Sequence, residues 1–174
     1  IADSMFTNAI VIPANRTVMP LSGNFIPGLH TNYTLNQMLQ DENSLMYLTM
    51  EINNRSLDAY EQGDGIENAL RTRFYKIFSA LGLDRDIVVN KELLFLKGEQ
   101  ITDYSMANAS DGEKSVAYLI MATLLAPQNS FLFIDEPERH LNGALMRNLF
   151  DILEIERSDL RFVYLTHIID FVES

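Results

Sequence analysis

Hydrophobic spacing predicts one short strand and then a helical segment in the first half of the chain. Residues 9–13 form a β-branched run closed by proline, which predicts a buried strand. Residues 17–34, rich in Pro, Gly, Ser and Asn, predict a loop. Two stretches with helical periodicity follow, on either side of a glycine-containing break at 63–65, and the second ends at Gly82. Their apolar positions are Leu35, Met38, Leu39, Leu45, Leu48, Ile52 and Leu57, then Ile66, Leu70, Phe74, Ile77, Phe78 and Leu81. Apolar runs at 87–89 and 93–96 predict paired strands.

The pattern changes after about residue 100 to an alternation of helices and buried strands. A helical pattern over 113–124 stops at Pro127, and a continuous apolar run follows at 130–134. A second helical pattern over 141–153 precedes another run at 162–165. Because continuous apolar strands are typical of parallel sheets, we predict an α/β fold whose sheet is covered by helices on both faces.

Two acids end the first buried strand of this half. Asp135 and Glu136 follow four apolar residues, and Pro137 comes next. The carboxyl end of a strand is where ligands bind in such sheets. One carboxylate there can orient Mg²⁺ through its water shell, and the next can activate a water for attack on a phosphoryl group. The alternative is a strand that ends in a solvated acidic turn.

The segment from Ser110 to Glu113 lies just before the first helix of this half. A hydroxyl and free backbone N–H groups at a helix N-terminus can contact an anion, because the helix dipole attracts negative charge. The alternative is a capping box between Ser110 and Glu113, which would serve only the helix. The nearby Gly112-Glu113-Lys114-Ser115 is not a phosphate-binding P-loop, since its Gly-Lys pair is interrupted.

His167 follows the second buried strand of this half. An imidazole at that place could bond a γ-phosphate or the attacking water. A lone histidine at a strand end is also compatible with a purely structural role.

Charge and composition limit the classes of function. The 174 residues carry 13 Lys and Arg against 24 Asp and Glu, for a net charge of −11. Such acidity does not indicate a nucleic-acid binder, because that affinity depends on neutralising phosphates. The absence of cysteine excludes disulfides and thiolate metal sites. No apolar run approaches the roughly 20 residues of a membrane span. The absence of cysteine fits a reducing cytosol, so we expect a cytoplasmic protein.

Four motifs in order resemble those of ABC-type P-loop ATPases, in the soluble branch that includes SMC-like, RecF-like and OLD-like proteins. Residues 110–113 resemble the signature motif, and 131–136 look like Walker B. Residues 140–142 resemble the D-loop, and 166–167 look like the switch. The string Ile-Asp-Glu-Pro-Glu-x-His-Leu at 134–141 is typical of soluble members often described as AAA-type. The resemblance covers about 104–169 and, loosely, the strand at 9–16.

The resemblance implies a P-loop NTPase-like parallel sheet flanked by helices, and a role for each motif. Residues 17–98 would form an inserted helical subdomain, and 99–174 the region of the four motifs. Asp135 would hold Mg²⁺, Glu136 would be the general base, and His167 would contact the γ-phosphate. Ser110 and the Gly112 amide would reach the γ-phosphate of a nucleotide bound to the opposite subunit, and Glu113 would belong to the same binding segment. Asn142 would lie near the dimer interface.

The sequence departs from the family pattern in two ways. Asp111 stands where the signature motif has glycine, which places a carboxylate near the docked phosphate. No Gly-x-x-x-x-Gly-Lys-Ser/Thr occurs in the chain, and the chain begins with Ile1. In the family the P-loop precedes the helical insertion, so we expect this chain to be the C-terminal part of an ATPase domain and inactive by itself.

The leading functional hypothesis is therefore an ATPase that works through ATP-dependent homodimerisation, in genome maintenance or phage defence, with an effector protein as a further partner. The alternative is a degenerate ATPase-fold module that binds a protein partner. A transporter subunit fits less well, because the 137–142 string differs from transporter D-loops.

Overall fold

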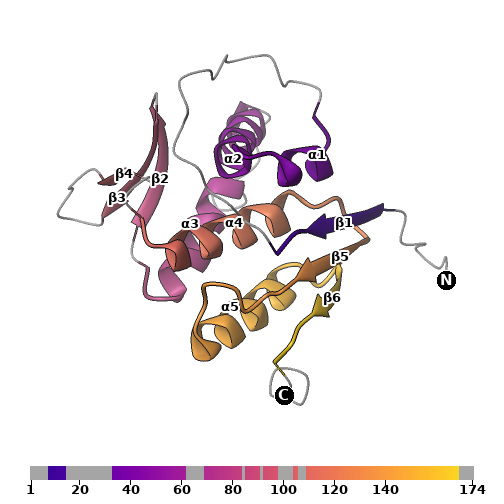
Figure 1. Ribbon diagram of the computed structural model, residues 1–174. Coiled ribbons are helices and arrows are strands. Elements are labelled where there is room, and N and C mark those ends of the chain that lie inside the picture. The colour runs from indigo at the N-terminus through magenta and orange to yellow at the C-terminus, as the bar shows by residue number, and fades with distance from the viewer. Residues whose placement is uncertain are drawn as a thin grey trace.

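The computed structural model describes residues 8–14, 33–61, 69–83, 85–90, 92–97, 104–105 and 109–168. It contains a three-stranded parallel sheet with the order β1-β5-β6, which lies on one side of the helices (Figure 1). The parallel pairing predicted from the apolar runs is thus confirmed. These strands are β1 (Asn8–Ile12), β5 (Ser130–Asp135) and β6 (Arg161–Leu165). The helices are α1 (Leu35–Gln40), α2 (Ser44–Glu61), α3 (Leu70–Ala80), α4 (Asp111–Leu125) and α5 (Gly143–Glu156).

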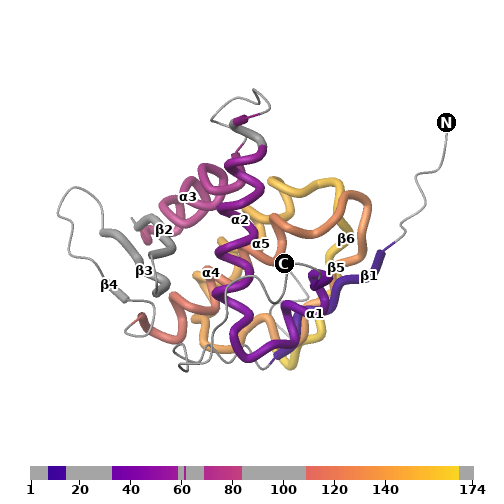
Figure 2. The backbone as a smooth tube through the Cα atoms, turned by 90° about the horizontal axis from the view of Figure 1, so that it is seen from above, coloured from indigo at the N-terminus to yellow at the C-terminus, as the bar shows by residue number. Residues whose placement is uncertain are grey.

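Helix α4 is the most buried element. Every residue from Ser115 to Leu125 is buried. Helices α1, α2, α3 and α5 all pack on it, and Figure 2 shows α2 passing over it. The buried side chains of these helices and of the sheet belong to one hydrophobic core. The helical segment that precedes α4 therefore shares its core with the sheet.

The first predicted helical stretch is wrong as one continuous helix, because the chain breaks between α1 and α2. Asp41 has an extended backbone (φ −84°, ψ 146°), and its carboxylate accepts a hydrogen bond from the Asn43 N–H at 2.8 Å. This short aspartate turn competes with the helix for backbone bonds. The second stretch begins at Leu70 after the N-cap Ala69, later than the periodicity from Ile66 indicates. Residues 62–68, including the predicted break, lie outside the described residues, as do the predicted loop residues 17–32.

The predicted strand pair at 87–96 is confirmed as a separate antiparallel sheet. It contains β2 (Arg85–Asn90), β3 (Glu92–Lys97) and the short β4 (Tyr104–Ser105), which the pattern did not indicate. Strand β2 lies next to α3 and α2. This sheet is on the opposite side of the helices from the parallel sheet (Figure 1).

The prediction of a sheet covered on both faces is wrong for the described residues. Ile10, Leu132 and Ile134 lie on the covered face and are at most 5% exposed. Val11 (45%) and Leu165 (55%) lie on the other face. The chain crosses the sheet in one direction, from β1 to β5 to β6. Right-handed connections in one direction place all crossovers on the same face, so the second face receives no described helix.

The outer edge of β1 is closed by a side chain from α1. Asn36 accepts a hydrogen bond from the Val11 N–H through Oδ1 at 3.0 Å, and its Nδ2 donates to the Ala9 carbonyl at 3.0 Å. The amide thus satisfies two of the backbone groups that a further strand would pair with. No helix among the described residues is long and apolar enough to cross a membrane.

Candidate functional site

The candidate site begins where β5 ends. Asp135 is the last residue of the strand and pairs with Leu165 of β6. The Glu136 N–H adds one more bond, to the Leu165 carbonyl at 2.8 Å. Glu136 has a φ of 46°, which is uncommon for a residue with a side chain. This conformation ends the strand at Asp135 and turns the chain into the segment 137–142.

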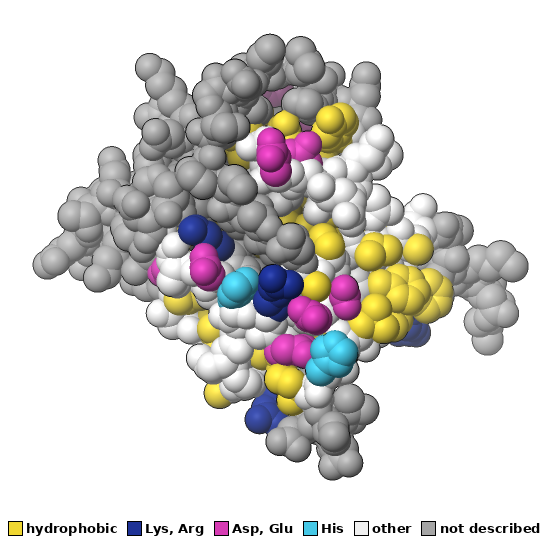
Figure 3. Space-filling model, in the orientation of Figure 1, with side chains coloured by type: hydrophobic (Ala, Val, Ile, Leu, Met, Phe, Trp, Pro, Cys, Tyr) yellow, Lys and Arg dark blue, Asp and Glu magenta, His cyan; other side chains and the backbone are white. Residues whose placement is uncertain are grey.

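Two cationic or ionisable groups flank the Glu136 carboxylate. Arg139 Nη1 lies 3.5 Å from Oε2, and His167 Nε2 lies 3.9 Å from Oε1. The Glu136 side chain is 36% exposed, so water reaches it. Figure 3 shows acidic, basic and histidine side chains gathered on this face, beside an apolar patch. The structure therefore brings Glu136 and His167 together at the carboxyl ends of two neighbouring strands.

Glu138, to which the sequence motifs assign no role, lies between the ends of β5 and β6. Its Oε2 accepts a hydrogen bond from the Thr166 hydroxyl at 2.9 Å, and its Oε1 accepts one from the His167 N–H at 3.1 Å. Burial acts to raise the pKa of Glu138. Hydrogen bonds from its own backbone, from His167 and from Thr166 outweigh burial and hold the pKa below its ordinary value of 4.5. The signal in the sequence was a third acid two residues after Glu136.

The start of α4 has the capping box that was the alternative interpretation of this segment. The Ser110 hydroxyl accepts a bond from the Glu113 N–H at 3.2 Å, and Glu113 Oε2 accepts bonds from the Ser110 N–H at 2.9 Å and hydroxyl at 3.0 Å. Both side chains therefore serve the helix N-terminus. Asp111 is exposed, and Lys114 lies 3.7 Å from its carboxylate.

Gly112 connects this helix start to the segment after β5. A Cβ at position 112 would lie 3.1 Å from the His140 carbonyl oxygen, closer than ordinary van der Waals contact. The signature-like and D-loop-like segments thus touch within one chain. Asn142 caps α5, accepting a bond from the Leu145 N–H at 2.9 Å.

The residues at the end of β5 fit Mg²⁺ that is bound mainly through waters and phosphates. No group of three or more His, Asp or Glu that could hold a metal ion occurs among the described residues. Mg²⁺, however, is commonly held by one or two carboxylates together with waters and substrate phosphates. Asp135, at the end of a strand, matches that mode. The P-loop that would cradle the β- and γ-phosphates does not occur in the sequence.

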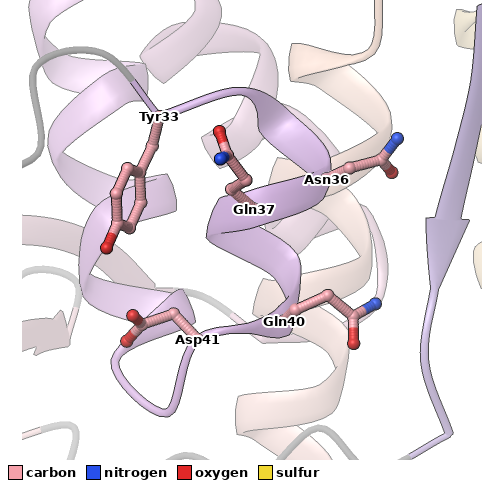
Figure 4. Close-up of a pocket in the computed structure, with 5 residues that line it drawn as sticks. All are labelled: Tyr33, Asn36, Gln37, Gln40 and Asp41. Atoms are coloured by element: carbon pink, nitrogen blue, oxygen red, sulfur yellow. The ribbon is translucent and has the colours of Figure 1, made fainter.

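A shallow hollow beside α1 does not suit a nucleotide. It has a volume of about 490 Å³ and is lined by Tyr33, Asn36, Gln37, Gln40 and Asp41 (Figure 4). Two of these side chains are already used by the fold: Asn36 bonds β1, and Gln37 bonds the Thr34 cap. The lining contains a carboxylate and no cation, so it offers no positive charge to balance that of a phosphate.

The parallel sheet with its flanking helices, and the acids at its carboxyl edge, are those of a P-loop NTPase-like α/β domain. A family model described as "AAA domain, putative AbiEii toxin, Type IV TA system" matches residues 25–173. The chain therefore belongs to this family of AAA-type domains, whose general function is nucleotide binding of the ATPase type. None of the curated proteins matches the sequence.

Proposed function

We propose that this chain supplies the hydrolytic half of an ATP site in an ATPase of the soluble ABC-type, SMC-, RecF- and OLD-like branch. The observation that carries the proposal is the placement of Asp135 and Glu136 at the end of β5, beside His167 at the end of β6. An acidic turn that served only solubility would not require a histidine at the neighbouring strand end. Membership of an AAA-type family supports the same assignment.

Each of these residues would have a separate role in the attack of water on a phosphoryl group. Mg²⁺, when bound, would neutralise charge on the phosphate oxygens. Asp135 would orient the ion through its water shell, and Glu136 would accept the proton of the attacking water. Arg139 and His167 lie on either side of the Glu136 carboxylate, at 3.5 and 3.9 Å. His167 is exposed and could reach a phosphate oxygen.

The proposal extends to two copies of the protein that enclose ATP between them. Free backbone N–H groups at the start of α4, at Asp111 and Gly112, would face the nucleotide of the other copy. The Ser110 hydroxyl and Glu113, held by the capping box, would keep that helix end in place. Asn142 would lie near the interface. Such a protein would work in the cytoplasm, in genome maintenance or phage defence, with an effector partner.

The first test replaces Glu136 by Gln in the full-length gene product. Removing the general base should lower ATP turnover by at least about 100-fold, since general acid–base catalysis contributes about 10²–10⁴-fold. ATP binding should persist, and ATP-dependent dimers should accumulate in size-exclusion chromatography. The matched control is Glu156→Gln, because Glu156 pairs with Arg73 on α3, outside the candidate site. Parental turnover in Glu136→Gln would show that Glu136 is not the base.

The second candidate function is a non-catalytic module of the same fold that binds a protein partner. Two observations favour it: the chain contains no P-loop, and the capping box accounts for Ser110 and Glu113 by folding alone. Equilibrium binding of ATP to the full-length gene product separates the two functions. Micromolar affinity supports the ATPase, and no binding at millimolar ATP supports the module.

A further inference from the structure

Two short turns lie side by side at the carboxyl edge of the sheet. One follows β5 and contains Glu136 and Glu138; the other follows β6 and contains His167. Strand pairing stops at Asp135 and Leu165, with one further bond from the Glu136 N–H. Beyond that point, the Glu138 carboxylate joins the two turns through hydrogen bonds from Thr166 and His167.

We propose that Glu138 is a positioning residue that holds His167 opposite Glu136. The His167 side chain is 87% exposed, so packing does not set its place. Its position follows from its backbone, whose N–H donates to Glu138. This inference rests on the proposed ATPase function, because it gives His167 a task in hydrolysis.

Thr166 extends this anchor, by which we mean the bonds between Glu138 and the turn after β6, to the backbone that follows His167. The Thr166 hydroxyl donates to Glu138 Oε2 and accepts a bond from the Ile168 N–H at 3.0 Å. A hydroxyl has one proton, so its donation to Glu138 is consistent with its acceptance from Ile168. The backbone on both sides of His167 is thereby tied to one carboxylate. Each oxygen of that carboxylate accepts one of the two bonds from the turn after β6.

The test compares Glu138→Met, Glu138→Gln and the parent in the full-length protein. Methionine removes both acceptors at similar length. Glutamine keeps an oxygen for the His167 N–H and an NH₂ that can donate to the Thr166 oxygen. We expect amide exchange at His167, measured by NMR on protein labelled with ¹⁵N-histidine, to accelerate about tenfold or more in Glu138→Met. Glu138→Gln should largely restore the protection.

We expect the kcat values of the three proteins to follow the same order as the protection of the His167 amide. Glu138→Met should lower kcat about tenfold with the KM for ATP within about twofold, since the lost interaction is local to hydrolysis. Glu138→Gln should recover most of kcat. Glu154→Met is the matched control: Glu154 accepts a bond from Tyr164 of β6 at 2.5 Å, on the face towards α5. It should alter neither His167 exchange nor kcat.

Each contrary result has a distinct meaning. Unchanged His167 exchange in Glu138→Met overturns the proposal, and so does accelerated exchange with parental kcat. A parent that hydrolyses no ATP refutes the proposed function and with it a catalytic task for this anchor, while the exchange data still decide whether Glu138 holds His167. If Glu138→Met does not fold, Thr166→Val removes one side of the anchor and should show the same changes in smaller measure.

Discussion

Gly112 shows how a residue in a ligand-binding motif can also be required by packing. Its Cα lies against the backbone of His140, a residue whose φ of 66° already places the chain in a left-handed turn. The glycine thus permits the first turn of α4 to approach the 137–142 segment. Close packing is therefore a reason for glycine at this position that does not depend on phosphate binding.

We predict that Gly112→Ala lowers the free energy of unfolding by about 1 kcal/mol. Alanine is favoured over glycine in helices by at most about 1 kcal/mol, and less in the first turn. The 3.1 Å contact is with a backbone oxygen, which cannot rotate away as a side chain can. Urea unfolding measures the change.

Gly143→Ala is the control for this prediction. A Cβ at position 143 would meet only the Arg147 Nη2 atom, at 3.8 Å, which is ordinary contact with a flexible group. We expect a change within about 0.5 kcal/mol. Equal effects of the two substitutions would show that the 112–140 contact does not constrain the fold.

At the scale of elements, the end of α4 depends on one arginine. Arg157 is 6% exposed and donates to the carbonyls of Thr123, Leu124 and Ala126 at 2.7–3.1 Å. Asp159 accepts two further bonds from it at 2.8 Å. The last carbonyls of a helix have no partner within the helix, and a cation near them is favoured by the helix dipole. Arg157 supplies both the hydrogen-bond donors and the positive charge at this helix end.

We predict that Arg157→Met lowers the free energy of unfolding by about 3–4 kcal/mol, within the range for breaking a buried pair. The loss leaves buried carbonyls and Asp159 without their partner. Arg157→Lys should recover part of it, because an ammonium cannot reproduce the planar fork. Arg55→Met is the comparison: Arg55 is half exposed and pairs with Glu51 on one helix, so its loss should be within about 0.5 kcal/mol.

The same pair predicts how this stabilisation depends on pH. The hydrogen bond from Arg157 is the largest cause that lowers the pKa of Asp159 below its ordinary 3.8. A lowered pKa in the folded state means that the contribution is complete above about pH 4–5 and is lost as the pH falls through the folded value. The difference between parent and Arg157→Met should therefore be constant near neutrality and shrink below pH 4. A constant difference at low pH would exclude the Asp159 part of the argument.

At the scale of the whole molecule, the parallel sheet has one covered and one open face among the described residues. Ile12, Leu132 and Ile134 are fully buried between the strands and the helices. Phe131 and Leu165 on the other face are 37% and 55% exposed. The uniform hydrophobicity of the strands gives no indication of this difference.

We predict that leucine-to-alanine substitutions on the two faces differ in cost. Leu132→Ala should lower the free energy of unfolding by about 3–4 kcal/mol, since it leaves a cavity in a packed core. Leu165→Ala, with more than half its surface exposed, should cost less than about 1 kcal/mol. Urea unfolding of the two variants measures the difference in their free energies of unfolding. Equal costs would mean that the open face is covered in solution.

Local patterns predicted most of the elements and the place of the candidate acids. Parallel strands have their carboxyl ends at one edge, so ordering the runs at 130–134 and 162–165 was enough to expect Asp135, Glu136 and His167 to be neighbours. The capping box of Ser110 and Glu113 was also visible, because its partners are three residues apart. Such features depend on nearby residues and leave a signal in the sequence.

Only the tertiary structure decided what depends on contacts between distant segments. Arg157 reaches carbonyls more than 30 residues away, Asn36 closes the edge of β1, and Glu138 joins the turns after two strands. Each of these side chains bonds backbone groups. Because nearly every residue carries the same backbone groups, no periodicity in the sequence marks the partners. The sequence by itself determined the α/β alternation and the acids at the strand end, because periodicity and strand ends are local. Which face of the sheet is open followed from the direction of the crossovers, and the bonds between Glu138 and the turn after β6 followed from the pairing of the two strands.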